Sequence, residues 1–203
     1  KDDGQYFVKI ARMGNYYALK GQVYYREHNA HLDNFILVPE ADFNTFQIIE
    51  SCDDLYSNDY AKDKTYVYFN EKPLREINVN KFQCLDLAYV TDGEDIYTQG
   101  TLIKDVDVQS FKTLSINYSQ DKNHVFFKGE KLSEADPNSF QVLGSKYFDL
   151  VGKDKNHVYY ENTIIESADA ASFERISDYD GEYYQRNVYL FKDKNYVYYQ
   201  NKI

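Results

Sequence analysis

Two histidines and two cysteines are the residues of this sequence best suited to binding a metal. His28 and His31, together with Cys52 and Cys84, would supply four nitrogen and sulfur ligands for zinc. Their spacing matches no standard zinc finger, and Cys84 takes a position that other copies of an internal repeat fill with ordinary packing residues. We therefore expect no zinc site. Two cysteines are too few for a disulfide framework, although a single bridge between them remains open.

Repeated aspartates could form a calcium ladder, because hard cations prefer carboxylate oxygens. The aspartates are Asp63, Asp92, Asp121, Asp154 and Asp193. A lysine follows four of the five, which weakens the calcium hypothesis, so we expect each Asp to cap a local turn through its side chain. The acidic segment 178–182 lacks the spacing of an EF-hand loop and is expected to be a turn. We expect no metal and no other cofactor.

Two further histidines, His124 and His157, occupy one slot of the same repeat, which other copies fill with Gln22, Tyr66, Asp95 or Tyr196. A catalytic group is not expected at a position that recurs along a repeated sequence. We interpret both as half-exposed strand residues. Phosphate-binding glycine loops, nucleophile elbows and His-Glu-x-x-His elements are absent from the sequence, so we expect no catalytic residue and no enzyme activity.

Tyrosines are the residues most suited to binding a partner, since a phenol offers a large contact area with a polar tip. They gather with Asp and Asn in two long connections, 51–61 and 177–187, and a shorter insertion spans 28–34. The candidate contact residues are Tyr56, Asp59, Tyr60, Asp178, Tyr179, Asp180, Tyr183 and Tyr184. A protein partner is the preferred interpretation, and a glycan bound by exposed tyrosines is the alternative. The tyrosines that recur within the repeat itself are expected to form the stacking core.

The elements that must position these residues are tandem repeats. The segment Asp-Lys-Thr-Tyr-Val-Tyr-Phe at 63–69 returns at 121–127, 154–160 and 193–199, with a degenerate copy at 92–98. A second landmark, of the type Ala-Asp-Pro-x-Ser-Phe, ends at Phe46, Phe82, Phe111, Phe140 and Phe173. The distance from Asp to the following Phe is 19 residues in four copies, whereas the distance from Phe to the next Asp varies. The variable half should therefore carry the surface loops.

These two landmarks resemble the DKNYY family, which is named for its Asp-Lys-Asn-Tyr-Tyr repeat. The resemblance extends from about Leu19 to the C-terminus, and the first copy departs from the pattern through the 28–34 insertion. The resemblance implies a repeat architecture and a bacterial source. It carries over no catalytic residues, because the family has no established biochemical activity.

The repeat predicts a mostly β protein of antiparallel β-meanders, each about 30 residues long, with one short helical turn per copy. The segment 123–132 reads as a hairpin, with Gly100, Gly129, Asn162 and Asn201 at the turn position. Both faces of strands such as Val67-Tyr68 are apolar, so neighbouring units should cover them. We expect one repeat domain, 1–203, of about six units in an open β-solenoid-like array. In the alternative, Phe7 to Ile10 completes the last unit and closes a propeller-like ring.

The amino-acid composition argues against several classes of protein function. A net charge of −10 over 203 residues opposes binding to a nucleic-acid backbone. No apolar run approaches the roughly 20 residues of a membrane-spanning helix, so no transmembrane segment is expected. We expect a non-catalytic protein-binding or scaffolding module. An exported, envelope-associated location is favoured by the acidic, Tyr-rich composition and by a start at Lys1, and a cytoplasmic one is the alternative.

Overall fold

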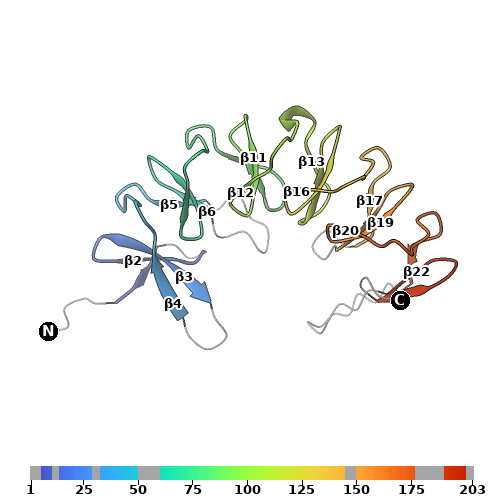
Figure 1. The fold of residues 1–203 in the computed structure, drawn as a ribbon. Coiled ribbons are helices and arrows are strands. Elements are labelled where there is room, and N and C mark those ends of the chain that lie inside the picture. The colour runs from blue at the N-terminus through green and yellow to red at the C-terminus, as the bar shows by residue number, and fades with distance from the viewer. Residues whose placement is uncertain are drawn as a thin grey trace. The chain divides into compact units, whose positions relative to one another are not determined.

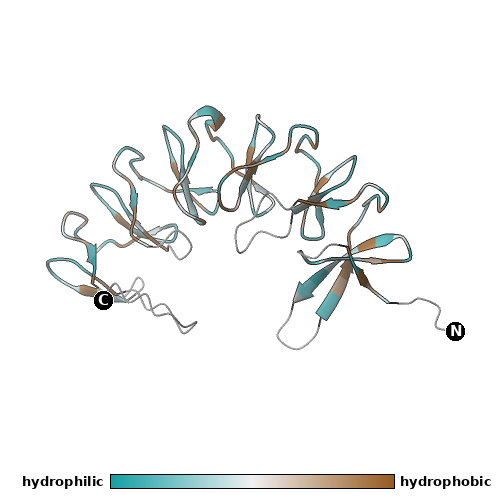
Figure 2. Ribbon diagram, turned by 180° about the vertical axis from the view of Figure 1, so that it is seen from behind, coloured by the Kyte–Doolittle hydropathy of each residue, from teal (hydrophilic) through white to brown (hydrophobic). Residues whose placement is uncertain are grey.

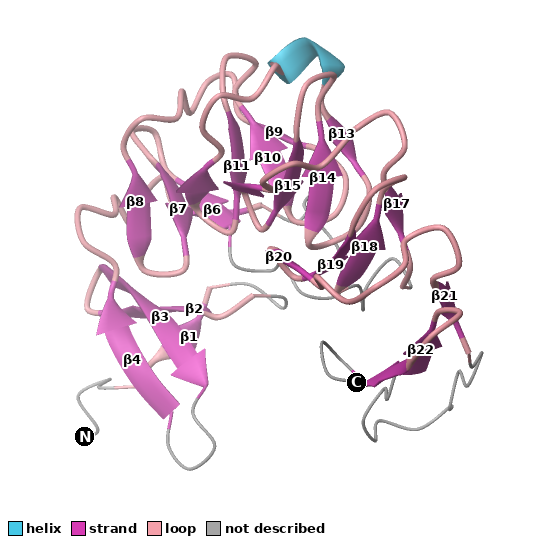
Figure 3. Ribbon diagram, turned by 45° about the vertical axis from the view of Figure 1, so that its right-hand side comes forward, coloured by secondary structure: helices cyan, strands magenta, loops and turns pink. Residues whose placement is uncertain are grey.

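The protein is almost entirely β-structure in this computed structural model (Figure 3). The structure describes residues 6–10, 14–28, 33–49, 60–144, 150–176 and 190–199. These ranges contain no α-helix, and therefore no helix long and apolar enough to cross a membrane. The mostly β class expected from the sequence is confirmed.

Contacts divide the chain into two compact units, an N-terminal unit (Lys1–Ile103) and a C-terminal unit (Lys104–Ile203). The expectation that both belong to one repeat domain remains a prediction. Each unit contains three small antiparallel sheets, in which strands adjacent in sequence are adjacent in the sheet (Figure 1). The sheets are thus meanders, as the alternating pattern predicts.

The N-terminal unit holds the first three sheets. They are β1 (Val8–Lys9), β2 (Tyr16–Leu19), β3 (Gln22–His28) and β4 (Asp33–Leu37); β5 (Gln47–Ile48), β6 (Tyr60–Lys62), β7 (Val67–Phe69) and β8 (Lys72–Leu74); and β9 (Gln83–Cys84), β10 (Tyr89–Thr91), β11 (Ile96–Thr98) and β12 (Thr101–Leu102). Strand β1 pairs with β2, so the N-terminal strand belongs to the first sheet. The expectation, in the alternative, that it completes the last sheet was wrong.

The C-terminal unit holds the other three sheets. They are β13 (Lys112–Thr113), β14 (Tyr118–Gln120), β15 (Val125–Phe127) and β16 (Glu130–Lys131); β17 (Gln141–Val142), β18 (Val151–Lys153), β19 (Val158–Tyr160) and β20 (Thr163–Ile164); and β21 (Glu174–Arg175), β22 (Leu190–Lys192) and β23 (Val197–Tyr199). In five of the six sheets the first strand starts directly after the Phe of a landmark turn. The variable half of the repeat therefore joins the first strand of a sheet to the second.

The hairpin predicted over 123–132 is confirmed by the pairing of β15 with β16. Its two turn residues, Lys128 and Gly129, both have positive φ, at 49° and 82°, as a two-residue hairpin turn requires. Gly100 repeats this geometry at φ 73°. In the 161–162 turn the left-handed residue is Glu161 rather than Asn162, and Asn201 lies outside the described residues.

The predicted helical turn forms in one copy. There, η2 (Val108–Ser110) is a 3₁₀ turn capped by Asp107. In the other copies, the same segment is a turn closed by one backbone hydrogen bond, such as Thr45 N–H to the Asp42 carbonyl at 3.0 Å. The expectation of a helical turn in every copy was too strong, because the other copies keep this single hydrogen bond without continuing as a 3₁₀ helix.

Both faces of the central strands are buried, as the sequence predicts. Val67 and Tyr68 in β7 are each 0% exposed, and so are Val158 and Tyr159 in β19. Hydrophobic stretches recur in the strands of the sheets (Figure 2). Val197 in β23 is the exception among these valines, with 54% of its surface exposed.

Aromatic side chains connect successive sheets within a unit. Phe46 packs against Tyr16 of the first sheet and Tyr68 of the second, with ring centroids 5.2 and 5.5 Å apart. Phe140 joins Tyr118 and Tyr159 in the same way, at 5.4 and 5.9 Å. Each landmark Phe of this kind therefore fills the space between two sheets.

Buried tyrosines add hydrogen bonds between sheets. The Tyr16 hydroxyl donates to the Asn70 carbonyl of the next hairpin at 2.8 Å, and the Tyr118 hydroxyl donates to the Glu161 carbonyl at 3.0 Å. The Tyr60 hydroxyl instead accepts from the Gly100 N–H at 3.1 Å. One residue of a sheet thus holds the hairpin turn of the next sheet.

Substituting Gly100 tests this close fit. A Cβ at Gly100 would lie 2.9 Å from Phe69, and φ is 73°, whereas Gly21, at φ 75°, has nothing within 4 Å of its Cβ position. We expect Gly21→Ala to lower the free energy of unfolding by about 1–2 kcal/mol for the left-handed backbone. Gly100→Ala should lower it by a further 1–3 kcal/mol or so, because of overpacking. Urea unfolding measures both, and equal losses would contradict the packing of Gly100 on Phe69.

Candidate functional site

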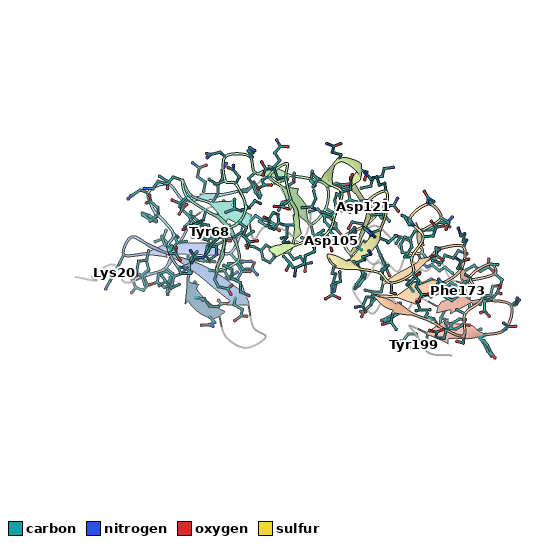
Figure 4. All side chains as sticks on the ribbon, turned by 45° about the horizontal axis from the view of Figure 1, so that its top comes forward. Lys20, Tyr68, Asp105, Asp121, Phe173 and Tyr199 are labelled. Carbon is teal, nitrogen blue, oxygen red and sulfur yellow. The ribbon has the colours of Figure 1, made fainter. Side chains whose placement is uncertain are left out.

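The most regular polar feature of the structure is a buried aspartate that begins each Asp-Lys segment. We call Asp63, Asp92, Asp121, Asp154 and Asp193 the clasp aspartates; they are 4%, 5%, 1%, 3% and 9% exposed. Oδ1 of each accepts two local backbone N–H groups, for example those of Asn123 and His124 at 2.7 and 2.6 Å from Asp121. Figure 4 labels Asp121 on the ribbon. This confirms the predicted capping role.

The second carboxylate oxygen of each clasp aspartate binds the landmark turn that precedes it in sequence. Oδ2 of Asp63 accepts the Asp42 N–H at 2.8 Å, and Oδ2 of Asp121 accepts the Asp107 N–H at 2.7 Å. The same bond forms from Asn78 to Asp92, from Asp136 to Asp154 and from Asp169 to Asp193, at 2.8, 2.9 and 2.8 Å. One buried carboxylate therefore holds two separate turns together.

The lysine after the clasp aspartate strengthens the same junction. Lys122 Nζ lies 2.6 Å from Oδ2 of Asp107, and its backbone N–H donates to the Ser110 hydroxyl at 3.0 Å. Lys64, Lys155 and Lys194 make the corresponding ion pairs with Asp42, Asp136 and Asp169 at 2.7, 2.8 and 2.8 Å. These lysines are exposed, so each ion pair contributes little to stability compared with the buried hydrogen bonds.

The calcium ladder finds no support in this geometry. Both oxygens of a clasp aspartate face N–H donors, which a cation would have to displace. Across the described ranges, no three His, Cys, Asp or Glu side chains gather closely enough to hold a metal.

Burial and hydrogen bonding act in opposite directions on the carboxylates of Asp63, Asp92, Asp121 and Asp193. Burial alone would raise the pKa, but the backbone N–H groups favour the charged form more strongly. The pKa values of Asp63, Asp92 and Asp121 are therefore lowered, and that of Asp193 falls to about 2. Asp63, Asp92, Asp121 and Asp193 are therefore structural anions rather than acids poised for proton transfer near neutral pH.

A tyrosine five residues after the clasp aspartate completes several of these junctions. The hydroxyls of Tyr68 and Tyr198 donate to Asp63 and Asp193 at 2.8 and 2.7 Å, and Tyr159 reaches Asp154 at 3.4 Å. In the Asp121 copy the residue is Phe126, which has no hydroxyl. Tyr97 is different again, since its buried hydroxyl has no hydrogen-bond partner within the described part of the chain.

The histidines of the repeated slot lie just before the strands. The side chains of His124 and His157 are 23% and 30% exposed, which agrees with the half-exposed structural role expected from the sequence. His157 Nε2 lies 3.9 Å from a carboxylate oxygen of Glu134. His124 Nδ1 lies 3.6 Å from Oδ2 of Asp121.

Cys84 in β9 is disulfide-bonded. The second cysteine of the chain, Cys52, lies outside the described residues, as does His31. A disulfide sulfur is not a thiolate, so Cys84 is not a zinc ligand in this state. Because Cys52 and His31 are not among the described residues, the expectation that they form no zinc site remains a prediction.

Seven of the eight candidate contact residues lie outside the described residues; they are Tyr56, Asp59, Asp178, Tyr179, Asp180, Tyr183 and Tyr184. The eighth, Tyr60, lies in β6 and is 1% exposed. Its hydroxyl accepts from Gly100, and burial raises its pKa to about 12. Tyr60 was therefore wrongly grouped with the loop residues, because periodicity places it in the core at the end of the connection.

The sequence matches the DKNYY family over residues 16–148 and 127–202, so the chain belongs to this family. Neither a curated protein nor a solved structure matches it. The resemblance drawn from the Asp-Lys repeats is confirmed. The aspartate that names the family is the clasp aspartate of the structure.

Replacing one clasp aspartate tests the junction directly. Asp63→Asn keeps the size of the side chain but replaces one acceptor oxygen with an amide NH₂ donor. In either orientation this NH₂ group would face backbone N–H donors, those of Thr65 and Tyr66 or that of Asp42, and could not hydrogen-bond to them. We expect a loss of roughly 2 kcal/mol or more in the free energy of unfolding. The matched control is Tyr68→Phe, which copies the natural Phe126 arrangement and should cost only about 1 kcal/mol. Equal losses in urea unfolding would argue against the carboxylate as the dominant group.

Acidification should weaken the fold through the same carboxylates. The folded pKa values of Asp63, Asp92, Asp121 and Asp193 are lowered. The contribution of these four carboxylates is therefore complete above the ordinary aspartate pKa of about 3.9 and disappears as pH falls through the folded values. For Asp193 that folded value is about 2. The urea concentration at the unfolding midpoint should therefore decrease as the pH is lowered from about 4 to about 2. Asp193→Asn should lower the midpoint at neutral pH and make it less dependent on pH, and an unchanged pH dependence would contradict the assignment.

Proposed function

We propose that this chain is a non-catalytic binding or scaffolding module. In this proposal, tandem β-meander units stack in an open β-solenoid-like array and present variable loops to a protein partner. The supporting observation is the contrast between the two halves of the repeat. The clasp, the landmark turn and the hairpin keep the same contacts in successive copies, while the connection between the first and second strands changes in length.

The absence of catalysis is also part of the proposal. The clasp carboxylates with shifted pKa values accept structural hydrogen bonds, and the most buried tyrosines pack between sheets. A rigid frame with variable connections is the usual arrangement of a recognition protein. The connections 51–61 and 177–187 are the ones proposed to contact the partner, since they combine Asp, Asn and Tyr.

Glycan binding is the second candidate. Tyr6, Tyr196 and Tyr199 are 68%, 45% and 47% exposed, so tyrosine rings are accessible outside the core. Exposed aromatic rings can stack on sugar faces. A change in tyrosine fluorescence on addition of envelope polysaccharides would favour this function over protein binding.

The disulfide at Cys84 supports an exported location, because disulfides persist in oxidising compartments. We propose an envelope-associated bacterial protein. Alkylation of the native protein without reductant, followed by mass spectrometry, should find Cys84 unmodified. Alkylation of Cys84 in protein taken directly from cells would favour the cytoplasm instead.

Loop replacement tests the protein-binding proposal. The intact chain should capture a stoichiometric protein from lysate or envelope fractions of the source organism, and a variant with 177–187 replaced by a short Gly-Ser link should lose it. Lys131→Gln, on the exposed strand β16, is the control and should retain the partner. Capture that survives loop replacement contradicts recognition by this loop. Failure of the intact chain to capture any protein contradicts protein binding and favours the glycan alternative.

A further inference from the structure

The last sheet of the C-terminal unit exposes an apolar face. Val197 and Tyr199 lie on one side of β23 and are 54% and 47% exposed. Leu190 in β22 pairs with Tyr199 and is half-buried. Ile176, whose N–H donates to the Leu190 carbonyl, is 44% exposed. Paired residues of neighbouring strands share a face, so these four side chains form one surface, which we call the terminal face.

The equivalent face of the two preceding sheets is covered by the sheet that follows. The valines equivalent to Val197 are Val125 and Val158, and both are 0% exposed. Val158 belongs to one hydrophobic cluster with Phe191 of the next sheet, and Val125 belongs to another with Tyr159 of the next sheet. No further sheet follows β23 in the described part of the unit. The terminal face is therefore a surface of the kind that packs against a neighbouring β-meander elsewhere in the same unit.

One acidic and one basic side chain lie beside the apolar residues of the terminal face. Glu174 pairs with Lys192 across β21 and β22, and Lys192 pairs with Val197 across β22 and β23. Lys192 Nζ lies 3.0 Å from a Glu174 carboxylate oxygen, and the two side chains are 49% and 62% exposed. When a two-fold axis brings two such faces together, the acid of each copy can meet the base of the other. The charges therefore favour a second copy of this chain as the occupant.

The first sheet offers no matching surface, because its own aromatic residues cover it. Tyr24 holds the position in the first sheet that Tyr198 holds in the last. The Tyr24 ring contacts Phe7, with centroids 5.1 Å apart, and Phe7 stacks on Phe35 of β4 at 3.9 Å. This face is thus capped, as the outer face of a terminal repeat commonly is. A head-to-tail stack of copies would have to displace these rings, whereas contact between two terminal faces would not.

We propose that the terminal face binds the terminal face of a second copy, which gives a two-fold symmetric dimer. Ile176, Val197 and Tyr199 of each copy are removed from water, and Glu174 of each copy lies against Lys192 of the other. One side of a sheet of two- and three-residue strands is smaller than the roughly 800 Å² per partner of a standard interface, so the dimer is weak and depends on concentration. This proposal goes beyond the proposed function, since no other protein takes part.

Sedimentation velocity of the full chain tests for the dimer. The mass should rise from 24.0 kDa towards twice that value as the concentration increases from about 1 to about 500 μM. Val197→Lys should raise the dissociation constant roughly tenfold or more, because it places a second positive charge beside Lys192. Val8→Lys is the matched control, since Val8 is a strand valine of the first sheet that is 64% exposed. It should dimerise as the native chain does, and urea unfolding should show that both variants are folded.

A charge exchange tests the symmetry of the contact. Glu174→Lys and Lys192→Glu each leave two like charges on the face, so each variant alone should be mainly monomeric, and an equimolar mixture should restore a dimer with one chain of each kind. The proposal is overturned if the native chain stays monomeric, if it forms assemblies larger than two chains, if Val197→Lys dimerises as well as the native chain, or if the mixture stays monomeric. Failure to capture another protein would contradict the proposed function and leave this dimer unaffected.

Discussion

The buried carboxylate of the clasp aspartate is the interaction on which the rest of the structure depends. Its two oxygens accept hydrogen bonds from two segments that are not adjacent in sequence, the local turn and the preceding landmark turn. An unpaired buried carboxylate would be strongly unfavourable, so the fold tolerates this charge only when both turns are in place. Each copy is therefore constrained at the same point, whatever the length of the connection between its first two strands.

Aromatic packing joins neighbouring sheets through hydrophobic clusters, two of them in each unit. The landmark Phe ends the clasped turn and lies between tyrosines of two sheets, as Phe46 does between Tyr16 and Tyr68. Five of the six sheets have strands of only two or three residues and bury little surface alone, so most of their stability must come from such contacts with neighbours. This arrangement keeps the polar clasps and the apolar core in fixed register along the chain and leaves the connections free to vary.

Much of this architecture could be predicted from the sequence, because the spacing of apolar residues along a strand and along the repeat indicates which side chains are buried. The mostly β class, the 123–132 hairpin, the burial of both strand faces and the capping role of Asp121 all follow from residue type and spacing. The bond from Oδ2 to the preceding turn could not be predicted, since the sequence distance between the two partners varies from copy to copy. Tyr60 was misplaced because a residue at the end of a long loop can equally begin a strand.

The landmark turns lie at the surface, but they depend on hydrogen bonds to carboxylates that are buried. Hydrogen exchange measured by NMR tests this most directly, at the backbone amides of Asp42, Asn78, Asp107, Asp136 and Asp169. All five amides should exchange slowly, as core strand amides do, because each donates to a clasp aspartate. Exchange at the rate of an unprotected loop amide would contradict the central role of the clasp.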